Sequence, residues 1–371
     1  MRTALLLLSM VVPLLGQETE RLTSARWPHK AIRFGYRLPE GRKPAEKPTV
    51  RKAKVAKLVC LFVDLDGNGV FNEKGVDGWA LTGMNYLLPL EDTVVMELHR
   101  VEWSIDEQGQ QVEWKAQRLD IPREEEKVFR QFNYWRLING LPPVDYDAEL
   151  SGWCDQHCAW MEENGFKHAP EEGDAEMSPE VAHAGRSSML SQERPGMSVL
   201  MLYASFYHRL PLFRPSTRSI GIGCSPRYTS IDGITRKAPR AWQYPIVVPA
   251  PNSALQPTNF AREAPRPHPD GLENLGCPIT LTFDSGTVTE VQAKLSAGRR
   301  SVPILVSSPQ KPANPKRPDN RKSICLLPTQ PLRPKTLYSV EVSYKWNGKA
   351  ETKQWVFKTG RSRPVWGPAY R

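Results

Sequence analysis

Residues 132–144 read FNYWRLINGLPPV, and this stretch decides how the middle of the chain folds. Apolar side chains recur in it and just before it at a spacing of three to four residues, at Val128, Phe129, Phe132, Trp135 and Ile138. That spacing predicts a helix over residues 124–139. Gly140 then favours the backbone conformation that ends helices, and Pro142 and Pro143 prevent the helix from continuing.

Two more helices and a strand are predicted on the C-terminal side of this stretch. Residues 147–164 carry a single apolar stripe at helical spacing. A third helix follows Pro195 and ends at Pro211, and residues 219–224 alternate as a strand. Residues 123–249 are therefore predicted to form one domain of helices and strands.

Short runs of β-branched and aromatic residues lie on both sides of this domain and predict strands. On the N-terminal side, residues 58–122 are expected to form a small β module. On the C-terminal side, the alternating runs within residues 275–360 predict a β-sandwich. Residues 250–274 are rich in proline and predict a linker, and residues 361–371 form a tail.

The length, proline content and charge of the whole chain add further constraints. The chain has 371 residues, too many for one small module, and 34 of them are proline. The net charge is +10, and residues 17–57 alone hold twelve Lys or Arg against four Glu. This basic segment predicts a disordered linker, with adhesion to an acidic envelope polymer or an anionic lipid surface as the alternative. No basic and aromatic residues interleave further along, so we expect no nucleic-acid partner.

The N-terminus and the cysteines indicate an exported protein. Residues 1–16 place Arg2 before an apolar stretch that gives way to polar residues, which predicts a signal peptide and a secreted or periplasmic location. No apolar run is long enough for a transmembrane segment. Six cysteines permit disulfides in an oxidising compartment. We expect Cys277 to pair with Cys325, since both lie in one module, and the pairing of four others stays open: Cys60, Cys154, Cys158 and Cys224.

A loop rich in Asp, Asn and Gly follows the first predicted strand. Oxygen ligands at its positions one, three and five come from Asp64, Asp66 and Asn68, and a glycine stands at position six, as a calcium loop requires. The twelfth position is Gly75, so the bidentate glutamate of an EF-hand is missing. Glu73 or Asp77 could substitute only through a different loop path. A tight turn between two strands is the alternative interpretation.

The middle domain resembles a known family through a series of motifs in fixed order. These are the stretch 132–144, the helix with Cys154-Asp155-Gln156-His157-Cys158-Ala159-Trp160-Met161, then Lys167-His168, Ser178-Pro179-Glu180, Tyr207-His208-Arg209 and Ile220-Gly221-Ile222-Gly223. The series resembles the bacterial branch of the CAP superfamily, the SCP-like domain shared with cysteine-rich secretory and pathogenesis-related proteins. The resemblance implies an α-β-α sandwich with a groove. The strands of residues 275–360 look like a bacterial immunoglobulin-like domain, so the expected fold class is α+β multidomain.

The same resemblance implies a site in the groove, where the family commonly holds two histidines and two acidic residues that can bind a divalent metal. By position, His168 and His208 match the histidines and Glu180 falls near one acidic residue. The family's Gly-Glu-Asn is absent, and the third helix offers no second glutamate, so three ligands remain. Two imidazoles and a carboxylate can hold zinc with an open fourth position. A hydrogen-bonded cluster that braces the groove is the alternative, and His157 is expected to be a core residue.

These features together predict a secreted or periplasmic CAP-domain binding protein. Its groove, lined by histidine and glutamate, would be presented to an envelope polymer, a lipid or a surface protein. The alternative is a metal-assisted hydrolase acting on peptides or esters, with Glu180 as general base. The sequence lacks a nucleophile elbow, a His-Glu-x-x-His motif and a phosphate-binding glycine loop, which favours binding over catalysis.

Overall fold

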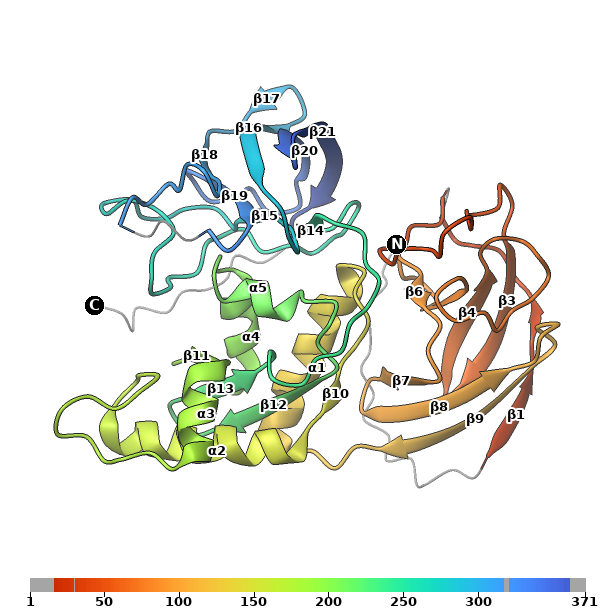
Figure 1. Cartoon of the computed structure of the whole chain (residues 1–371), viewed down its shortest axis with the longest axis horizontal. Coiled ribbons are helices and arrows are strands. Elements are labelled where there is room, and N and C mark those ends of the chain that lie inside the picture. The colour runs from red at the N-terminus through yellow and green to blue at the C-terminus, as the bar shows by residue number, and fades with distance from the viewer. Residues whose placement is uncertain (1–16, 30, 317–319, 361–371) are drawn as a thin grey trace.

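The chain folds into three parts that follow one another along the sequence (Figure 1). The computed structural model describes residues 17–29, 31–316 and 320–360. An all-β part comes first, a part of helices and strands lies in the middle, and a second all-β part ends the described chain. Within these residues, no helix combines the length and the apolar character needed to cross a membrane. The predicted signal peptide at 1–16 and the tail at 361–371 lie outside the described residues.

The N-terminal part consists of two sheets whose buried faces share one core. One sheet contains, in spatial order, β2 (Thr23–Ser24), β3 (Thr49–Val55), β4 (Leu58–Asp64), β5 (Gly78–Leu81) and β6 (Leu88–Pro89). The other contains β1 (Glu18–Arg21), β9 (Gln111–Arg118), β8 (His99–Ile105) and β7 (Thr93–Met96). Trp103 meets Phe62 and Trp79 edge-on in this core, with ring centroids 5.2 and 5.1 Å away.

The prediction of a disordered linker over residues 17–57 is wrong, because this segment supplies strands to both sheets. β3 pairs antiparallel with β4 along its whole length, which buries Val50 and Val55. Tyr36 is also buried, and its hydroxyl donates to the backbone carbonyl of Val76 at 3.1 Å. Charge did not prevent folding, since basic side chains such as Lys52 occupy exposed positions of the strand.

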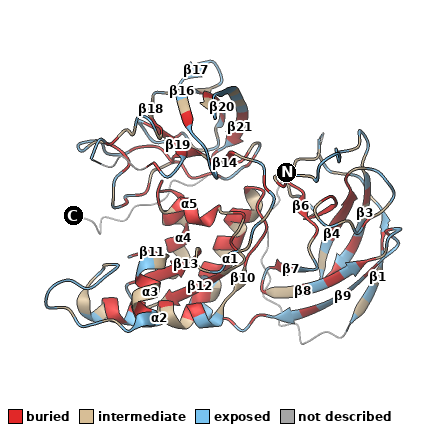
Figure 2. Cartoon of the chain, viewed as in Figure 1, coloured by how far each residue is buried: buried red, intermediate tan, exposed pale blue. Residues whose placement is uncertain are grey.

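The central part is layered, with a small sheet between helices (Figures 1 and 2). The sheet contains β10 (Asp145–Tyr146), β12 (Ser219–Cys224), β13 (Thr229–Asp232) and β11 (Ser188–Ser191). The helices are α1 (Arg123–Ile138), α2 (Ala148–Asn164), α3 (Pro179–Ser187), α4 (Pro195–Tyr203) and α5 (Arg209–Leu212). Gly223 lets α2 approach β12, since a Cβ there would lie 2.2 Å from the backbone carbon of Cys154. On the other face, Ile220 and Ile222 pack with the apolar side of α1.

The third predicted helix is interrupted. The sequence pattern predicted one helix from Pro195 to Pro211, but α4 ends at Tyr203 and α5 begins at Arg209. Of the residues between them, Phe206, Tyr207 and His208 direct their backbone N–H groups to a side chain from another segment, described below. Phe206 and Tyr207 are buried as the apolar pattern requires, although they do not lie on a continuous helix.

The C-terminal part consists of two antiparallel four-stranded sheets with a common core. One contains β14 (Ile246–Val248), β15 (Ile279–Thr282), β19 (Ser323–Pro328) and β18 (Ile304–Ser307). The other contains β17 (Arg300–Ser301), β16 (Val288–Ala297), β20 (Leu337–Trp346) and β21 (Lys349–Lys358). β14 lies in sequence before residues 250–274 but pairs with β15 after them, so the predicted linker connects two strands of one sheet. These residues are called the inter-domain segment below because they also bond to the central part.

The predicted disulfide between Cys277 and Cys325 is not formed, and all six cysteines are free thiols. Ile279 pairs with Leu326, so extending this register places Cys277 three positions from Cys325. Three positions along a strand correspond to roughly 10 Å, which is beyond the reach of a disulfide. Cys277 instead accepts a hydrogen bond from Nη2 of buried Arg209 at 3.3 Å.

Candidate functional site

His168 lies in the loop that connects α2 to α3, and this loop is fixed at several points. Lys167 pairs with Asp174 at 2.8 Å, and the backbone N–H of Ala175 donates to the side chain of Asn164. Nδ1 of His168 lies 2.7 Å from the carbonyl oxygen of Gly185 on α3. A carbonyl oxygen only accepts, so this nitrogen carries the hydrogen. The other ring nitrogen, Nε2, is then an acceptor while the ring is neutral.

His208 is held in the same way by a glutamate that the sequence did not single out. Its Nδ1 lies 2.9 Å from Oε2 of Glu263, whose side chain is only 1% exposed. The carboxylate of Glu263 also accepts from the backbone N–H groups of Phe206 at 2.6 Å, Tyr207 at 2.9 Å and His208 at 3.4 Å. These N–H groups lie between α4 and α5, where no helical carbonyl is available to them. Glu263 therefore joins the inter-domain segment to the turn that positions His208.

His168 and His208 line one pocket of about 550 Å³, and Glu263 lines it as well. Apolar side chains from the central domain form part of its wall, namely Phe166, Leu190, Met201 and Leu202. Polar and charged side chains line the rest, among them Ser191, Gln192, Glu193, Ser205, Arg262 and Arg266. The two predicted histidines thus meet at one cavity, together with a segment from outside the predicted domain.

Glu180 does not join them, which corrects the predicted three-ligand set. It lies in the first turn of α3, is exposed, and is not among the residues that line the pocket. A hydrogen bond from its own backbone N–H, and then one from the side chain of Ser178, lower the pKa of its carboxyl. Among the described residues, His168, Glu180 and His208 do not bring ligand atoms together as a metal would require. The zinc arrangement that the resemblance implies does not fit this pocket.

His157 is a core residue, as predicted, and it lies beside the pocket without lining it. The ring is fully buried on α2, and both of its nitrogens are buried without a hydrogen-bond partner. Burial, and then the charge of nearby His168, lowers its pKa to about 4. The imidazole is therefore neutral at physiological pH.

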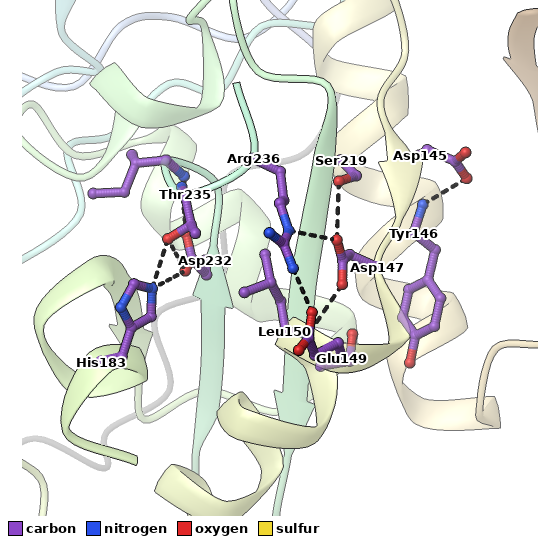
Figure 3. A network of polar contacts seen from close by, with 12 residues as sticks. Asp145, Tyr146, Asp147, Glu149, Leu150, His183, Ser219, Asp232, Thr235 and Arg236 are labelled. Atoms are coloured by element: carbon purple, nitrogen blue, oxygen red, sulfur yellow. Dashed lines mark hydrogen bonds and ion pairs between the residues drawn. The ribbon is translucent and has the colours of Figure 1, made fainter. Parts of the chain in front are cut away.

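A second polar network connects α3 and the start of α2 to the ends of the central strands (Figure 3). Nε2 of His183 lies 2.9 Å from the hydroxyl of Thr235, which donates to the buried carboxylate of Asp232 at 2.5 Å. In the same view, Arg236 pairs with Asp147 at 3.1 Å and with Glu149. No role was predicted for His183 from the sequence, and this network holds secondary structure elements together.

The predicted calcium loop has a different ligand set from the one its spacing indicated. Carboxylate oxygens of Asp64, Asp66 and Asp77 lie within 4.8 Å of one another. Asn68 is not part of this group, because its side-chain oxygen accepts from the backbone N–H of Val70 at 2.7 Å. Asp77 takes its place because the loop turns back after residue 72, as the backbone bond from Asp77 to Glu73 shows.

Burial dominates the electrostatics of this loop. Asp64 and Asp77 are buried, and burial is the largest cause that raises the pKa of both carboxyls, to about 7 for Asp77. Arg42 pairs with Asp66 and Glu73. Among the described residues, neither Asp64 nor Asp77 has a cationic partner within ion-pair distance.

Comparison with a protein-family model agrees with the central part of this description. The family model described as "CAP: Cysteine-rich secretory protein family" matches residues 129–232. No curated protein matches the chain. A solved structure of an extracellular protein containing an SCP domain from Bacillus anthracis matches with 13% identity and a TM-score of 0.25, over 54% of this chain and 87% of that one.

Proposed function

We propose, on the premise that residues 129–232 form a CAP domain, that this is an exported binding protein whose ligand occupies the pocket beside His168 and His208. One observation carries the proposal. Both histidines line the same cavity, and buried Glu263 fixes one of them from outside the matched residues. A metal-assisted hydrolase is not supported, because Glu180 is exposed and lies off the pocket.

The two imidazoles define what the ligand must offer. Gly185 and Glu263 each accept from an Nδ1, so the Nε2 of each ring is the nitrogen that remains for a ligand. A ligand that carries hydroxyl or amide donors, as envelope glycans and their peptides do, would pair with these nitrogens. Envelope polymers are exposed at the cell surface. We therefore favour them as ligands of this pocket over a ligand that has to be completely buried.

The flanking parts support a location outside the cytoplasm. The predicted signal peptide directs export, and two antiparallel four-stranded sheets follow the CAP domain. We propose that the C-terminal sheets are an immunoglobulin-like module, and that both β-rich parts present the pocket to a polymer, lipid or protein of the cell surface.

Co-sedimentation tests the proposed function. The purified full chain is mixed with insoluble peptidoglycan or with phosphatidylglycerol vesicles, and the bound fraction is measured for wild type and His208→Ala. His29→Ala is the matched control, because His29 is also half-buried but lies in the N-terminal part. Binding that falls at least fivefold for His208→Ala alone supports the proposal. The proposal would be overturned if His208→Ala and His29→Ala bound equally well. It would also be overturned if the protein hydrolysed a peptide or ester and this activity required His168.

A second site follows from the buried carboxylates of the N-terminal part. We propose that Asp64, Asp66 and Asp77 bind calcium, since hard cations prefer several carboxylate oxygens and two of these carboxylates are buried without a cationic partner. Calorimetric titration of the calcium-free protein should show one calcium ion bound per chain. Asp64→Asn should weaken this binding, whereas unchanged binding by that variant would contradict the assignment.

A further inference from the structure

The wall of the pocket opposite the CAP helices is formed by a segment outside the family match. In residues 259–268, the backbone N–H of Phe260 donates to Leu275, and that of Ala261 donates to Ala204 at the end of α4, at 2.9 and 2.8 Å. Ala261 and Glu263 are buried, so they attach the segment to the CAP domain. The segment therefore has a fixed place beside the pocket, although it has no regular secondary structure.

Two basic side chains lie close to these buried anchors in the sequence. Arg262 and Arg266 are exposed, and both line the pocket. The only carboxylate near Arg262 among the described residues is that of Glu273, 4.0 Å away on an exposed side chain. Arg266 has no carboxylate within ion-pair distance in the described part of the chain. Both guanidinium groups are thus available to a ligand.

Two other charged residues of the pocket, Lys167 and Glu263, already have partners. Lys167 pairs with Asp174 and Glu171, and the carboxylate of Glu263 is satisfied by His208 and backbone N–H groups. Glu193 also lines the pocket and would oppose an anion close to it. The free positive charge is consequently concentrated on the inter-domain segment, at one side of the cavity.

Four apolar side chains of the central domain also line the pocket. Met201 and Leu202 come from α4, Leu190 from β11, and Phe166 from the loop after α2. Phe166 is 38% exposed and stacks on Tyr228, with ring centroids 5.6 Å apart. An apolar group of a ligand could cover this surface and remove it from water.

We propose that the pocket selects a ligand that carries a carboxylate or phosphate group next to an apolar part, and that Arg262 and Arg266 recognise the anion. The inference rests on the proposed binding function and adds a ligand class to it. Guanidinium groups suit both anions, because their planar N–H donors match two oxygens at once. The specificity then comes from this chain's own inter-domain segment and not from the CAP domain.

Calorimetry with four small probes tests this inference on the purified full chain. Hexyl phosphate and hexanoate carry both groups, hexyl glucoside lacks the charge, and inorganic phosphate lacks the apolar part. We expect hexyl phosphate and hexanoate to bind at least tenfold more tightly than the other two. The double variant Arg262→Gln and Arg266→Gln should lose about tenfold for both anions and nothing for hexyl glucoside. Arg299→Gln with Arg300→Gln is the control, since both are exposed beside the β16–β17 turn.

The outcomes separate this inference from the binding function. Undiminished anion binding by the double variant, equal affinity for hexyl glucoside, or no binding of any probe overturns the inference. Met201→Trp, which fills the pocket from its half-buried position on α4, should abolish binding of every probe. If Met201→Trp binds the probes as the wild type does, they bind elsewhere, and the proposed role of the pocket fails together with the inference. A larger loss for hexyl phosphate than for hexanoate in the double variant identifies phosphate as the preferred anion.

Discussion

The two candidate sites of this protein differ in how far apart their residues lie in the sequence. The acidic site of the N-terminal part draws on Asp64, Asp66 and Asp77, which a single loop brings together. The pocket of the central domain draws on His168, His208 and Glu263, which come from two loops and an inter-domain segment. Spacing along the chain identified Asp64 and Asp66 of the first site, and its third residue, Asp77, lies in the same loop. The second exists only when three remote segments pack against one another.

This difference determines what each site requires of the fold. A loop that bonds to its own backbone can keep its ligands close together even when its surroundings shift. Glu263 is instead buried more than fifty residues from the groups it contacts, so the pocket depends on the packing of the inter-domain segment on α4. Removal of Glu263 should therefore damage both the fold and the site, whereas changes in the acidic loop should act locally.

The largest expected effect follows from Glu263→Ala. This change leaves three backbone N–H groups and Nδ1 of His208 without their buried acceptor, so we expect a loss of about 3–5 kcal/mol in the free energy of unfolding. Urea denaturation followed by tryptophan fluorescence measures it. Glu273→Ala is the control, because that side chain is 75% exposed and should change stability by less than about 0.5 kcal/mol. A comparable loss in both variants would show that Glu263 has no special role.

His157 gives the next largest effect, as a dependence of stability on pH. Its pKa of about 4 in the folded protein lies below its ordinary value of 6.5, so the unfolded chain binds the proton more readily. Its contribution is complete above pH 6.5 and declines as the pH falls towards 4, by up to about 3 kcal/mol. Urea midpoints measured between pH 7.5 and 4 should show this loss in the wild type and a smaller one in His157→Gln. Equal slopes in the two proteins would mean that other groups cause the acid sensitivity.

The sequence predicted those features that depend on local pattern. The helix over residues 124–139 and its end at Gly140 follow from apolar spacing and a proline pair, and α1 spans Arg123–Ile138. His168 and His208 were found because they belong to motifs. Glu263 was missed because nothing around it indicates that a carboxylate will meet unpaired N–H groups more than fifty residues away. Glu180 was misassigned because motif order does not specify which way the first turn of α3 faces.

The basic segment of residues 17–57 is a second case in which contacts with remote residues decide the structure. Here the sequence predicted disorder and the segment is folded. Its prolines and net charge favoured disorder, yet β3 alone pairs with the full length of β4. Composition reports the average tendency of a segment, whereas burial of Val50 and Val55 against a sheet already present decides its structure. Pairing partners that lie elsewhere in the chain are not visible in the segment itself.

Calcium should produce an intermediate effect that is confined to the N-terminal part. At a calcium concentration one hundred times its dissociation constant, linkage predicts about 2.7 kcal/mol of added stability. Thermal unfolding with and without calcium measures the shift. In Asp77→Asn the shift should shrink, because one buried oxygen ligand loses its charge, whereas Glu107→Gln, a change at an exposed residue outside the cluster, should keep it. A full shift in Asp77→Asn would leave the acidic site without support.

The smallest effect is expected in the network of Figure 3, which tests whether remote contacts are important even without a pocket. Arg236 joins Asp147 and Glu149 at the start of α2, but its side chain is 44% exposed. Ion pairs at such positions contribute little, so Arg236→Gln should lower stability only slightly, with a smaller loss at high salt. Urea denaturation at low and high salt measures both quantities. A loss as large as that of Glu263→Ala would mean that exposed contacts between remote segments stabilise the fold as much as buried ones do. The contrast between buried Glu263 and the surface ion pairs would then be wrong.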